Sequence, residues 1–141
     1  MTGETNLAKL LATMSPILMT GEFVFLSFPG AAYGDHANLK PVASIAEGEG
    51  LTLVVEKTQA DKHGFEYQSS YAGITLEVHS SLDAVGLTAA FSDKLTEYGI
   101  SANVIAGYFH DHIFVQSADA HQAMAALRQL SVITALRHLS A

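Results

Sequence analysis

A single stretch near the middle of the chain, residues 71–115, constrains the fold more than any other part of the sequence. It opens with apolar residues that alternate with polar ones (Ile74, Leu76 and Val78), the pattern of a strand with one buried face. An amphipathic segment at helical spacing follows, and Gly99 is typical of the position just after a helix. Two further apolar segments then flank a His-Asp-His turn. The order strand–helix–strand–strand predicts an α+β domain.

The predicted elements of this stretch form a crossover between two strands of one sheet. The helix is expected over residues 82–98, where Ser80 and Asp83 make a start that resembles a capping box. The two later strands are expected over residues 103–108 and 112–115. Because a crossover between strands of one sheet is right-handed, the first two strands should run parallel and end at one edge. The turn before the helix and the His-Asp-His turn are therefore predicted to meet in space.

The remainder of the chain predicts further elements but carries less chemistry. An early helix, with Thr5 as a candidate cap, should end at Ser15-Pro16 because the residue before a proline is disfavoured in a helix. Three strands are predicted over residues 22–28, 51–56 and 65–70. A short helix is predicted over residues 58–64, and a single helical turn over residues 42–47. A last helix follows Ser117, and the tail over residues 132–139 either extends it or returns as an edge strand.

Composition narrows the class of protein and its partners. The chain has 141 residues, of which 49% are hydrophobic and 15% charged, enough for one ordinary domain or two small ones. The net charge of −7, with no basic run, disfavours nucleic acid and anionic membranes as partners. Cysteine is absent, which excludes disulfides and thiol chemistry. The sequence shows neither a membrane-spanning segment nor a secretory leader, so a cytoplasmic protein is expected.

Residues 74–115, together with the Ala-rich helix that follows, resemble an ACT domain. The residues that carry this resemblance are ITLEVHSSLDAVGLTAAFSDKLTEYGISANVIAGYFHDHIFV. Over residues 1–70, the segments GEFVF and EGEGLTLVVE carry a resemblance only to the small stand-alone tandem ACT proteins. The chain is also similar to the ACT pairs of aspartokinases and to the ACT repeats of the CASTOR arginine sensors. The aspartokinase-type loop carries Pro-Gly before its helix, whereas residues 83–86 of this chain keep the glycine and lack the proline.

The resemblance implies a tandem of two ferredoxin-like subdomains, residues 1–70 and 71–141, with helices packed on one face of each sheet. It further implies a non-enzymatic sensor that holds an amino acid or a similar metabolite at the strand-to-helix loop, against a neighbouring ACT unit. A homodimer or higher homo-oligomer is expected, with no cofactor and no catalytic residue. The implied ligand-binding residues are His79, Ser80, Ser81, Leu82, Asp83, Val85, Gly86, Phe109, His110 and Asp111.

The residue types at this loop support a ligand independently of the resemblance. Unpaired backbone N–H groups at the start of a helix favour an anionic group such as an α-carboxylate. Ser80 and Ser81 add hydroxyl donors, and Gly86 allows close approach to the backbone. An ammonium group needs an acid nearby, and either Asp111 or Asp83 can supply it. The loop thus predicts a site for a zwitterionic small molecule.

Two other classes of function stay open beside the sensor. Metal binding is suggested by His79, His110 and His112, since imidazole suits zinc or nickel, although a metal site needs further ligands. A ligand-free ACT pair that oligomerises or contacts another protein is the third class. The simpler explanations are a helix cap for Ser80, Ser81 and Asp83, close packing for Gly86 and a solvated strand end for His79. The sequence contains no nucleophile-elbow or phosphate-loop motif.

Overall fold

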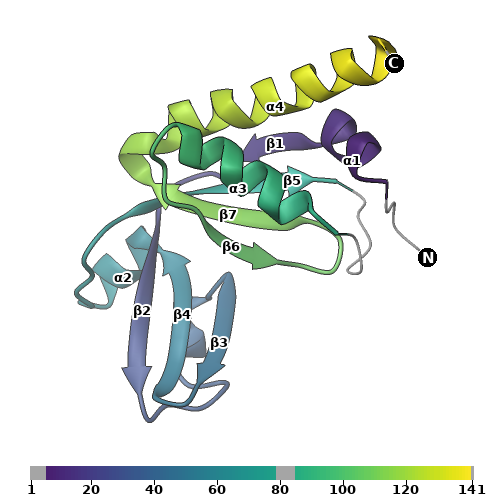
Figure 1. Ribbon diagram of the computed structural model, residues 1–141. Coiled ribbons are helices and arrows are strands. Elements are labelled where there is room, and N and C mark those ends of the chain that lie inside the picture. Colours follow the sequence, from purple (N-terminus) through teal and green to yellow (C-terminus); the bar gives the residue numbers. More distant parts are fainter. Residues whose placement is uncertain (1–5, 79–84, 141) are drawn as a thin grey trace. The chain divides into compact units, whose positions relative to one another are not determined.

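The computed structural model describes residues 6–78 and 85–140 (Figure 1). The chain divides into two compact units. The inserted unit is Thr20–Ala72, and the discontinuous unit combines Met1–Met19 with Gly73–Ala141. These units are defined by packing, and the first 19 residues of the chain pack with the C-terminal half. The predicted division of the sequence into two subdomains at residue 70 stays a prediction.

The discontinuous unit holds the strand–helix–strand–strand stretch and both ends of the chain. Its elements in chain order are α1 (Leu7–Thr13), β1 (Ser15–Leu18), β5 (Tyr71–Glu77, from Gly73 on), α3 (Leu87–Glu97), β6 (Asn103–Ala106), β7 (Asp111–Gln116), the 3-10 turn η2 (Ser117–Asp119) and α4 (Ala120–Ser140). The strand order is β6–β7–β5–β1. β6 pairs antiparallel with β7, and β1 pairs antiparallel with β5 with Leu18 opposite Ile74. This is a ferredoxin-like sheet whose fourth strand comes from the other end of the sequence.

One face of this sheet is covered by α1, α3 and α4 (Figure 1). Ile74 and Leu76 of β5 are fully buried, whereas Ile17 of β1, paired opposite Thr75, is 44% exposed. Side chains therefore alternate between a helix-covered face and an open face, as the sequence pattern predicted.

The early helix α1 contributes its apolar face to the core of the discontinuous unit. Leu10, Leu11 and Met14 are buried there, and α1 packs along α4. Ser131 of α4 donates its hydroxyl hydrogen bond to the carbonyl oxygens of Ala12 and Met14, at 3.1 and 3.3 Å. These contacts join residues more than 100 positions apart and link α4 to the end of α1, directly before β1.

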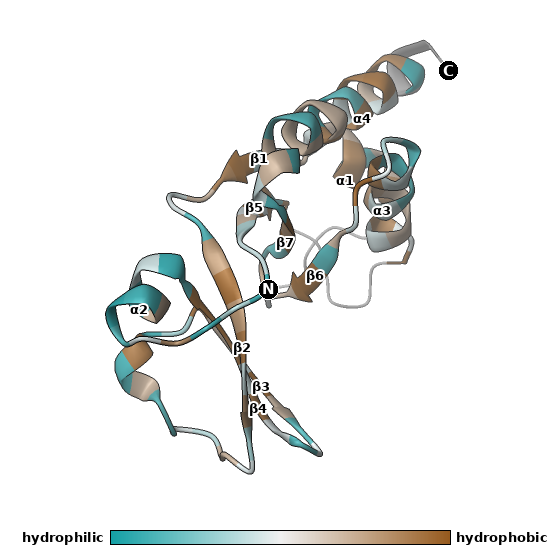
Figure 2. Ribbon diagram, turned by 90° about the vertical axis from the view of Figure 1, so that its left-hand side faces the viewer, coloured by the Kyte–Doolittle hydropathy of each residue, from teal (hydrophilic) through white to brown (hydrophobic). Residues whose placement is uncertain are grey.

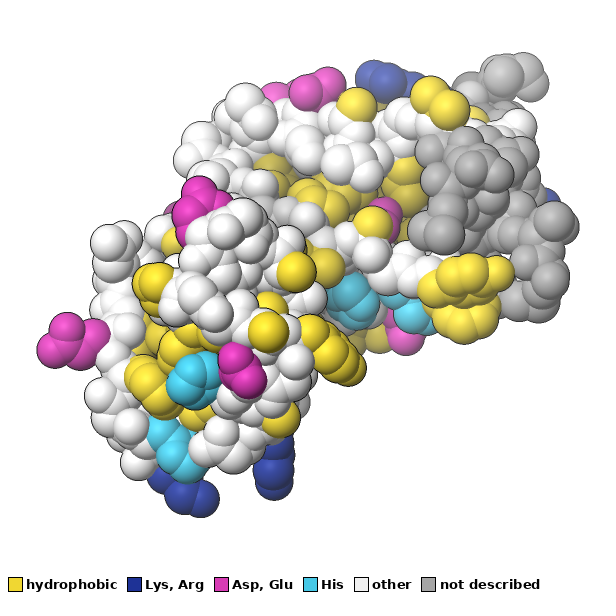
Figure 3. Space-filling view, turned by 90° about the horizontal axis from the view of Figure 1, so that it is seen from below, with side chains coloured by type: hydrophobic (Ala, Val, Ile, Leu, Met, Phe, Trp, Pro, Cys, Tyr) yellow, Lys and Arg dark blue, Asp and Glu magenta, His cyan; other side chains and the backbone are white. Residues whose placement is uncertain are grey.

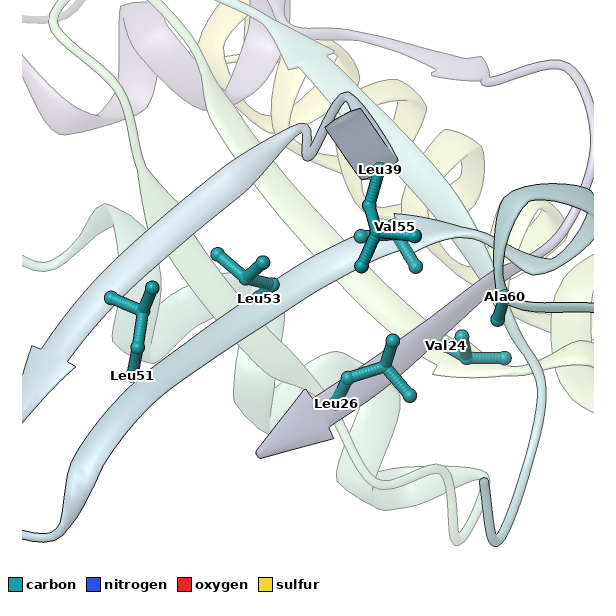
Figure 4. Packing of buried hydrophobic residues seen from close by; sticks show 7 residues of the cluster. All are labelled: Val24, Leu26, Leu39, Leu51, Leu53, Val55 and Ala60. Carbon is teal, nitrogen blue, oxygen red and sulfur yellow. The ribbon is translucent and has the colours of Figure 1, made fainter. Parts of the chain in front are cut away.

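The inserted unit is a second, smaller α+β arrangement. Its elements are β2 (Phe23–Pro29), the 3-10 turn η1 (Ala37–Leu39), β3 (Ala43–Glu47), β4 (Gly50–Glu56) and α2 (Lys57–Lys62), and Tyr71 at the start of β5 also belongs to it. The strand order is β3–β4–β2, with both pairs antiparallel. A cluster of buried residues fills its core (Figure 4): Val24, Leu26, Leu39, Leu51, Leu53, Val55 and Ala60. Figure 2 shows the matching pattern, with an apolar β2 beside an α2 that is largely hydrophilic.

The predicted α+β, ferredoxin-like class is confirmed, while several local predictions are wrong. β1 was not predicted, residues 42–47 contain a strand in place of a helical turn, and residues 65–70 contain no strand. The N-cap of α1 is Asn6, whose side chain accepts the N–H of Lys9, while Thr5 lies outside the described residues. The tail over residues 132–139 extends α4 as helix.

Within residues 6–78 and 85–140, no helix combines the length and the apolar character needed to cross a membrane, and this includes α4.

Candidate functional site

The end of β5 and the start of β7 meet at one edge of the discontinuous unit. Thr75 Oγ1 lies 3.2 Å from His112 Nδ1, which places these neighbouring strands in register near that edge. The turn that joins β6 to β7 is closed by a hydrogen bond from the N–H of Gly107 to the carbonyl of His110, at 2.9 Å. Figure 1 shows this turn at the end of the sheet where β5 stops and α3 begins. The end of β5 and the β6–β7 turn therefore lie at the same end of this sheet, while Ser80 and Ser81, the turn that was predicted to meet it, lie outside the described residues.

The helix α3 starts five residues later than predicted, at Leu87, and Gly86 is its N-cap. Gly86 has a φ of +94°, which an L side chain rarely adopts, and its carbonyl accepts the N–H of Ala90 at 2.9 Å. A Cβ at this position would lie 3.0 Å from Leu7 Cδ2. The predicted start at Leu82 is therefore wrong, because the backbone at Gly86 interrupts the helical path. The N-cap Gly86 has no side chain that could accept a hydrogen bond from the first turn of α3.

Asp111 is the acidic residue that the fold places out of water at this edge. Its relative exposure is 8%, and burial raises the pKa of its carboxyl group, while the imidazoles of His112 and His110 act in the opposite direction. Because Thr75 and His112 contact each other on the open face, Asp111 lies by alternation on the helix-covered face. A carboxyl group is thus present on the side of the sheet that α3 covers.

His112 is the partner of Thr75 and is only partly exposed. Burial lowers the pKa of its imidazole, the charge of His110 lowers it further, and Asp111 opposes both. A neutral imidazole is therefore favoured near neutral pH. Gly107 leaves room for this ring, since a Cβ there would lie 3.5 Å from His112 Nε2 and 2.9 Å from the carbonyl oxygen of His110.

Three apolar side chains near this edge are exposed to solvent. Val85 is 83% exposed, Tyr108 67% and Phe109 49%, and the two aromatic rings of the turn have centroids 5.0 Å apart. Large exposed apolar side chains that gather in one place are typical of a surface that another molecule covers.

Of the ten predicted ligand-binding residues, five lie outside the described residues: His79, Ser80, Ser81, Leu82 and Asp83. The other five are described, and they lie at the start of α3 (Val85 and Gly86) and at the β6–β7 turn (Phe109, His110 and Asp111). Thr75 and its contact with His112 were missed, because a threonine on the polar face of a strand gives no signal by itself. The sequence also gave no sign that Asp111 is buried.

The metal hypothesis rests partly on His79, which lies outside the described residues. Among the residues that the structure describes, no group of three or more His, Cys, Asp or Glu side chains is placed to hold a metal ion.

Comparison with known proteins identifies the family of the chain. Two sequence profiles, each described as ACT domain, match residues 2–72 and 68–129. A crystal structure of a Vibrio cholerae protein of unknown function, described as a possible transport protein, is 54% identical and has a TM-score of 0.80. The match covers 89% of this chain and 95% of that protein. The chain belongs to the ACT domain family. Its two ACT domains lie in tandem, and no curated protein matches the sequence.

Two more distant structures share the fold of these ACT domains. The ligand-free regulatory subunit of aspartate kinase from Thermus thermophilus is 11% identical, with a TM-score of 0.61 over 82% of this chain and 95% of that subunit. The aspartate kinase of Clostridium acetobutylicum is 10% identical, with a TM-score of 0.59 over 83% of this chain and 34% of that enzyme. At such identities the similarity establishes the fold alone.

Proposed function

We propose that this tandem ACT protein is a non-enzymatic regulatory sensor that binds an amino acid or a similar zwitterion at the edge formed by β5, α3 and the β6–β7 turn. The observation that carries the proposal is Asp111, whose carboxyl group lies at this edge with a side chain only 8% exposed. A buried carboxyl group is costly unless a cation compensates it, so its placement favours a positively charged ligand group.

The start of α3 supplies the complementary half of the site. Its N-cap, Gly86, contributes no side-chain acceptor, and backbone N–H groups at the start of a helix favour an anion such as an α-carboxylate. Asp111 lies on the sheet face that α3 covers, where it can accept an α-ammonium group. Donor groups and a carboxylate on the same side of the sheet match the two charges of a free amino acid. His79, Ser80, Ser81, Leu82 and Asp83 belong to the proposed site as further contacts from the preceding loop.

The exposed apolar residues at this edge support a site closed by a second ACT unit. Val85, Tyr108 and Phe109 would become buried when another copy of the chain covers the edge. We therefore propose a homodimer or higher homo-oligomer whose assembly depends on the ligand. Light scattering with and without the bound amino acid measures this dependence, and a constant mass under both conditions would remove ligand-dependent assembly from the proposal.

Thermal-shift screening of the purified protein against the free amino acids tests the binding proposal. A ligand present at a hundred times its Kd stabilises the folded state by about 2.7 kcal/mol, which raises Tm measurably. The Asp111→Asn variant should lose the response to the hit because it removes the acceptor for the ammonium group. The matched control is Asp93→Asn, an exposed carboxylate on α3, which should keep the response. A screen without any hit, or a hit that survives Asp111→Asn unchanged, contradicts the proposal.

A further inference from the structure

The inserted unit lacks most of the fourth strand that its ferredoxin-like order calls for. In the described residues, the ladder beside β2 on this side consists of one pair, Phe23 with Tyr71. Residues 65–70 lead into Tyr71 without forming a strand, although the sequence predicted one there. The edge of β2 beyond Phe23 therefore faces this irregular segment in place of a paired strand.

The backbone of β2 alternates between its two neighbours. The carbonyl of Glu22 accepts the N–H of Lys57, and the N–H of Gly30 donates to the carbonyl of Glu49, so the even-numbered residues of β2 direct their backbone groups toward β4. Ser27, which is exposed, consequently directs its backbone N–H and C=O toward the segment 65–70. A strand edge of this kind offers a donor and an acceptor to a small polar molecule.

Both ends of the segment 65–70 are held by hydrogen bonds within the inserted unit. At one end the N–H of Phe65 donates to the carbonyl of Ala60, and the hydroxyl of Tyr67 donates to Asp61 Oδ1 at 2.7 Å. At the other end Ser70 Oγ donates to Glu22 Oε1 at 2.9 Å. The space between the segment and β2 is thus a built feature of the inserted unit.

This space is a cleft of about 330 Å³, the size of small-molecule sites. Its lining is rich in aromatic rings and contains one charged residue, Glu66, and no Lys, Arg or His: Phe25, Leu26, Ser27, Phe28, Phe65, Glu66, Tyr67, Gln68, Ser69 and Tyr71. Two ring pairs stiffen it, Phe28 with Phe65 and Phe25 with Tyr71, at centroid distances of 5.3 and 5.1 Å. Figure 3 shows Lys and Arg side chains only toward the margins of the face that it presents.

We propose that this cleft is a second binding site, for a small organic amine with an apolar body and no carboxylate. Aromatic faces attract cations through their quadrupole, and Glu66 adds the opposite charge to an ammonium group. None of the lining residues is basic, and Glu66 is the charged one among them. Two basic residues outside the lining contact its rings: His36 stacks on Phe28 at a centroid distance of 3.9 Å, and Lys57 interacts with Tyr67. The backbone and hydroxyl of Ser27, with Gln68 and Ser69, offer hydrogen-bond partners beside the charge.

Titration of the full chain with three matched probes tests the ligand class. The probes are 2-phenylethylamine, its neutral analogue 2-phenylethanol and the anion 3-phenylpropionate, followed by NMR of the aromatic resonances. The amine should bind most tightly and shift the Tyr67 and Tyr71 signals, and the anion should bind least. An amine that fails to bind at millimolar concentration, or an anion that binds equally well, overturns the proposal.

A charge-neutralising pair of variants assigns the site. Glu66→Gln should weaken amine binding by about three- to fivefold, the effect of one partly exposed ion pair. Glu49→Gln removes another exposed carboxylate of the same unit that does not line the cleft, and it should leave the Kd unchanged. Equal effects of the two variants would show that net charge, and not this cleft, attracts the amine. Because both variants leave Asp111 intact, their outcome is independent of the amino-acid site.

Discussion

The two units of this protein follow the same strand order but complete it differently. The discontinuous unit has an eleven-residue crossover helix, α3, and a full fourth strand, β1. The inserted unit has an irregular crossover with the 3-10 turn η1, and its fourth strand amounts to the single pair Phe23 with Tyr71. β5 explains part of this difference, since its first two residues belong to the inserted unit and the rest is the first strand of the discontinuous unit.

This difference determines where each unit can bind a ligand. A complete sheet leaves its openings at the loops, so the discontinuous unit presents a helix start and Asp111 at one end of the strands. An incomplete sheet leaves an opening along a strand, so the inserted unit presents a cleft beside β2. One topology, repeated in tandem, therefore leaves its openings in two different places, for which we propose a zwitterion at the first and an amine at the second.

The largest expected effect comes from weakening the packing of α1 against the rest of the discontinuous unit. Leu10→Ala removes a side chain that is 1% exposed, and such truncations cost about 2–5 kcal/mol because a cavity remains. Urea denaturation measures the loss. Hydrogen exchange should show the added opening in β7 and α4 and spare β4, since the inserted unit does not contain Leu10.

The matched control is Val132→Ala on α4, where the side chain is 58% exposed. Its cost should stay within about 0.5 kcal/mol, as for most surface substitutions. Comparable losses for the two variants would mean that α1 does not support the core of this unit.

A smaller effect is expected from the glycine that sets the start of α3. Gly86→Ala should destabilise by about 1–3 kcal/mol because φ is +94° and the new Cβ would approach Leu7 Cδ2 to 3.0 Å. Gly99→Ala, with a φ of +69° and no neighbour within 4 Å of a Cβ, carries the backbone strain alone. Thermal unfolding of both variants separates the contact with Leu7 from the strain, and equal losses would show that this contact is unimportant.

The sequence predicted the elements whose periodicity is local and missed those that depend on distant partners. Alternation predicted β5, and helical spacing predicted the body of α3, whose Leu87, Phe91 and Leu95 are buried. β1 has only four residues, SPIL, and becomes a strand because β5 pairs with it across more than fifty positions. Residues 42–47 have weak propensity, and pairing with β4 makes them a strand.

The same distinction holds for the sites. The sequence predicted that β5 ends at the same edge as the β6–β7 turn, since a crossover between two strands of one sheet requires it. It placed Asp111 in a polar turn, where burial has no local signature. The cleft of the inserted unit could not be predicted, because it lies where residues 65–70, which read as a strand, do not pair with β2 and instead make side-chain hydrogen bonds through Tyr67 and Ser70.

A moderate effect of opposite sign is expected for Asp111. Its pKa is raised by burial, so the folded state favours the protonated carboxyl, and stability is lost as pH rises through that raised pKa. Asp111→Asn removes this cost and should raise Tm near pH 7 by a few degrees, about 1 kcal/mol in a chain of this size, while amino-acid binding is lost. A higher Tm together with the loss of amino-acid binding in Asp111→Asn would show that Asp111 serves binding at a cost in stability.

The pH dependence sharpens this prediction, because His112 acts in the other direction. Its pKa is lowered, so its contribution to stability is present above about pH 6.5 and is lost as pH falls through the lowered pKa. The Asp111→Asn gain in Tm should shrink on acidification because the wild-type carboxyl becomes protonated. A gain that stays constant from pH 7 to pH 4 would refute the assigned role of burial.

The smallest expected effect concerns the wall of the cleft in the inserted unit. Tyr67→Phe removes the hydrogen bond to Asp61 Oδ1 but keeps the ring, and an exposed bond of this kind contributes about 0.5–1 kcal/mol. Tyr33→Phe removes a hydroxyl from a side chain that is 87% exposed, and its cost should be close to zero. If the bond holds residues 65–70 away from β2, Tyr67→Phe should also weaken 2-phenylethylamine binding, because a mobile wall must be ordered on binding. Denaturation and NMR titration of the two variants measure both effects, and amine affinity that is unchanged in Tyr67→Phe would mean that the ring pairs alone keep the cleft open.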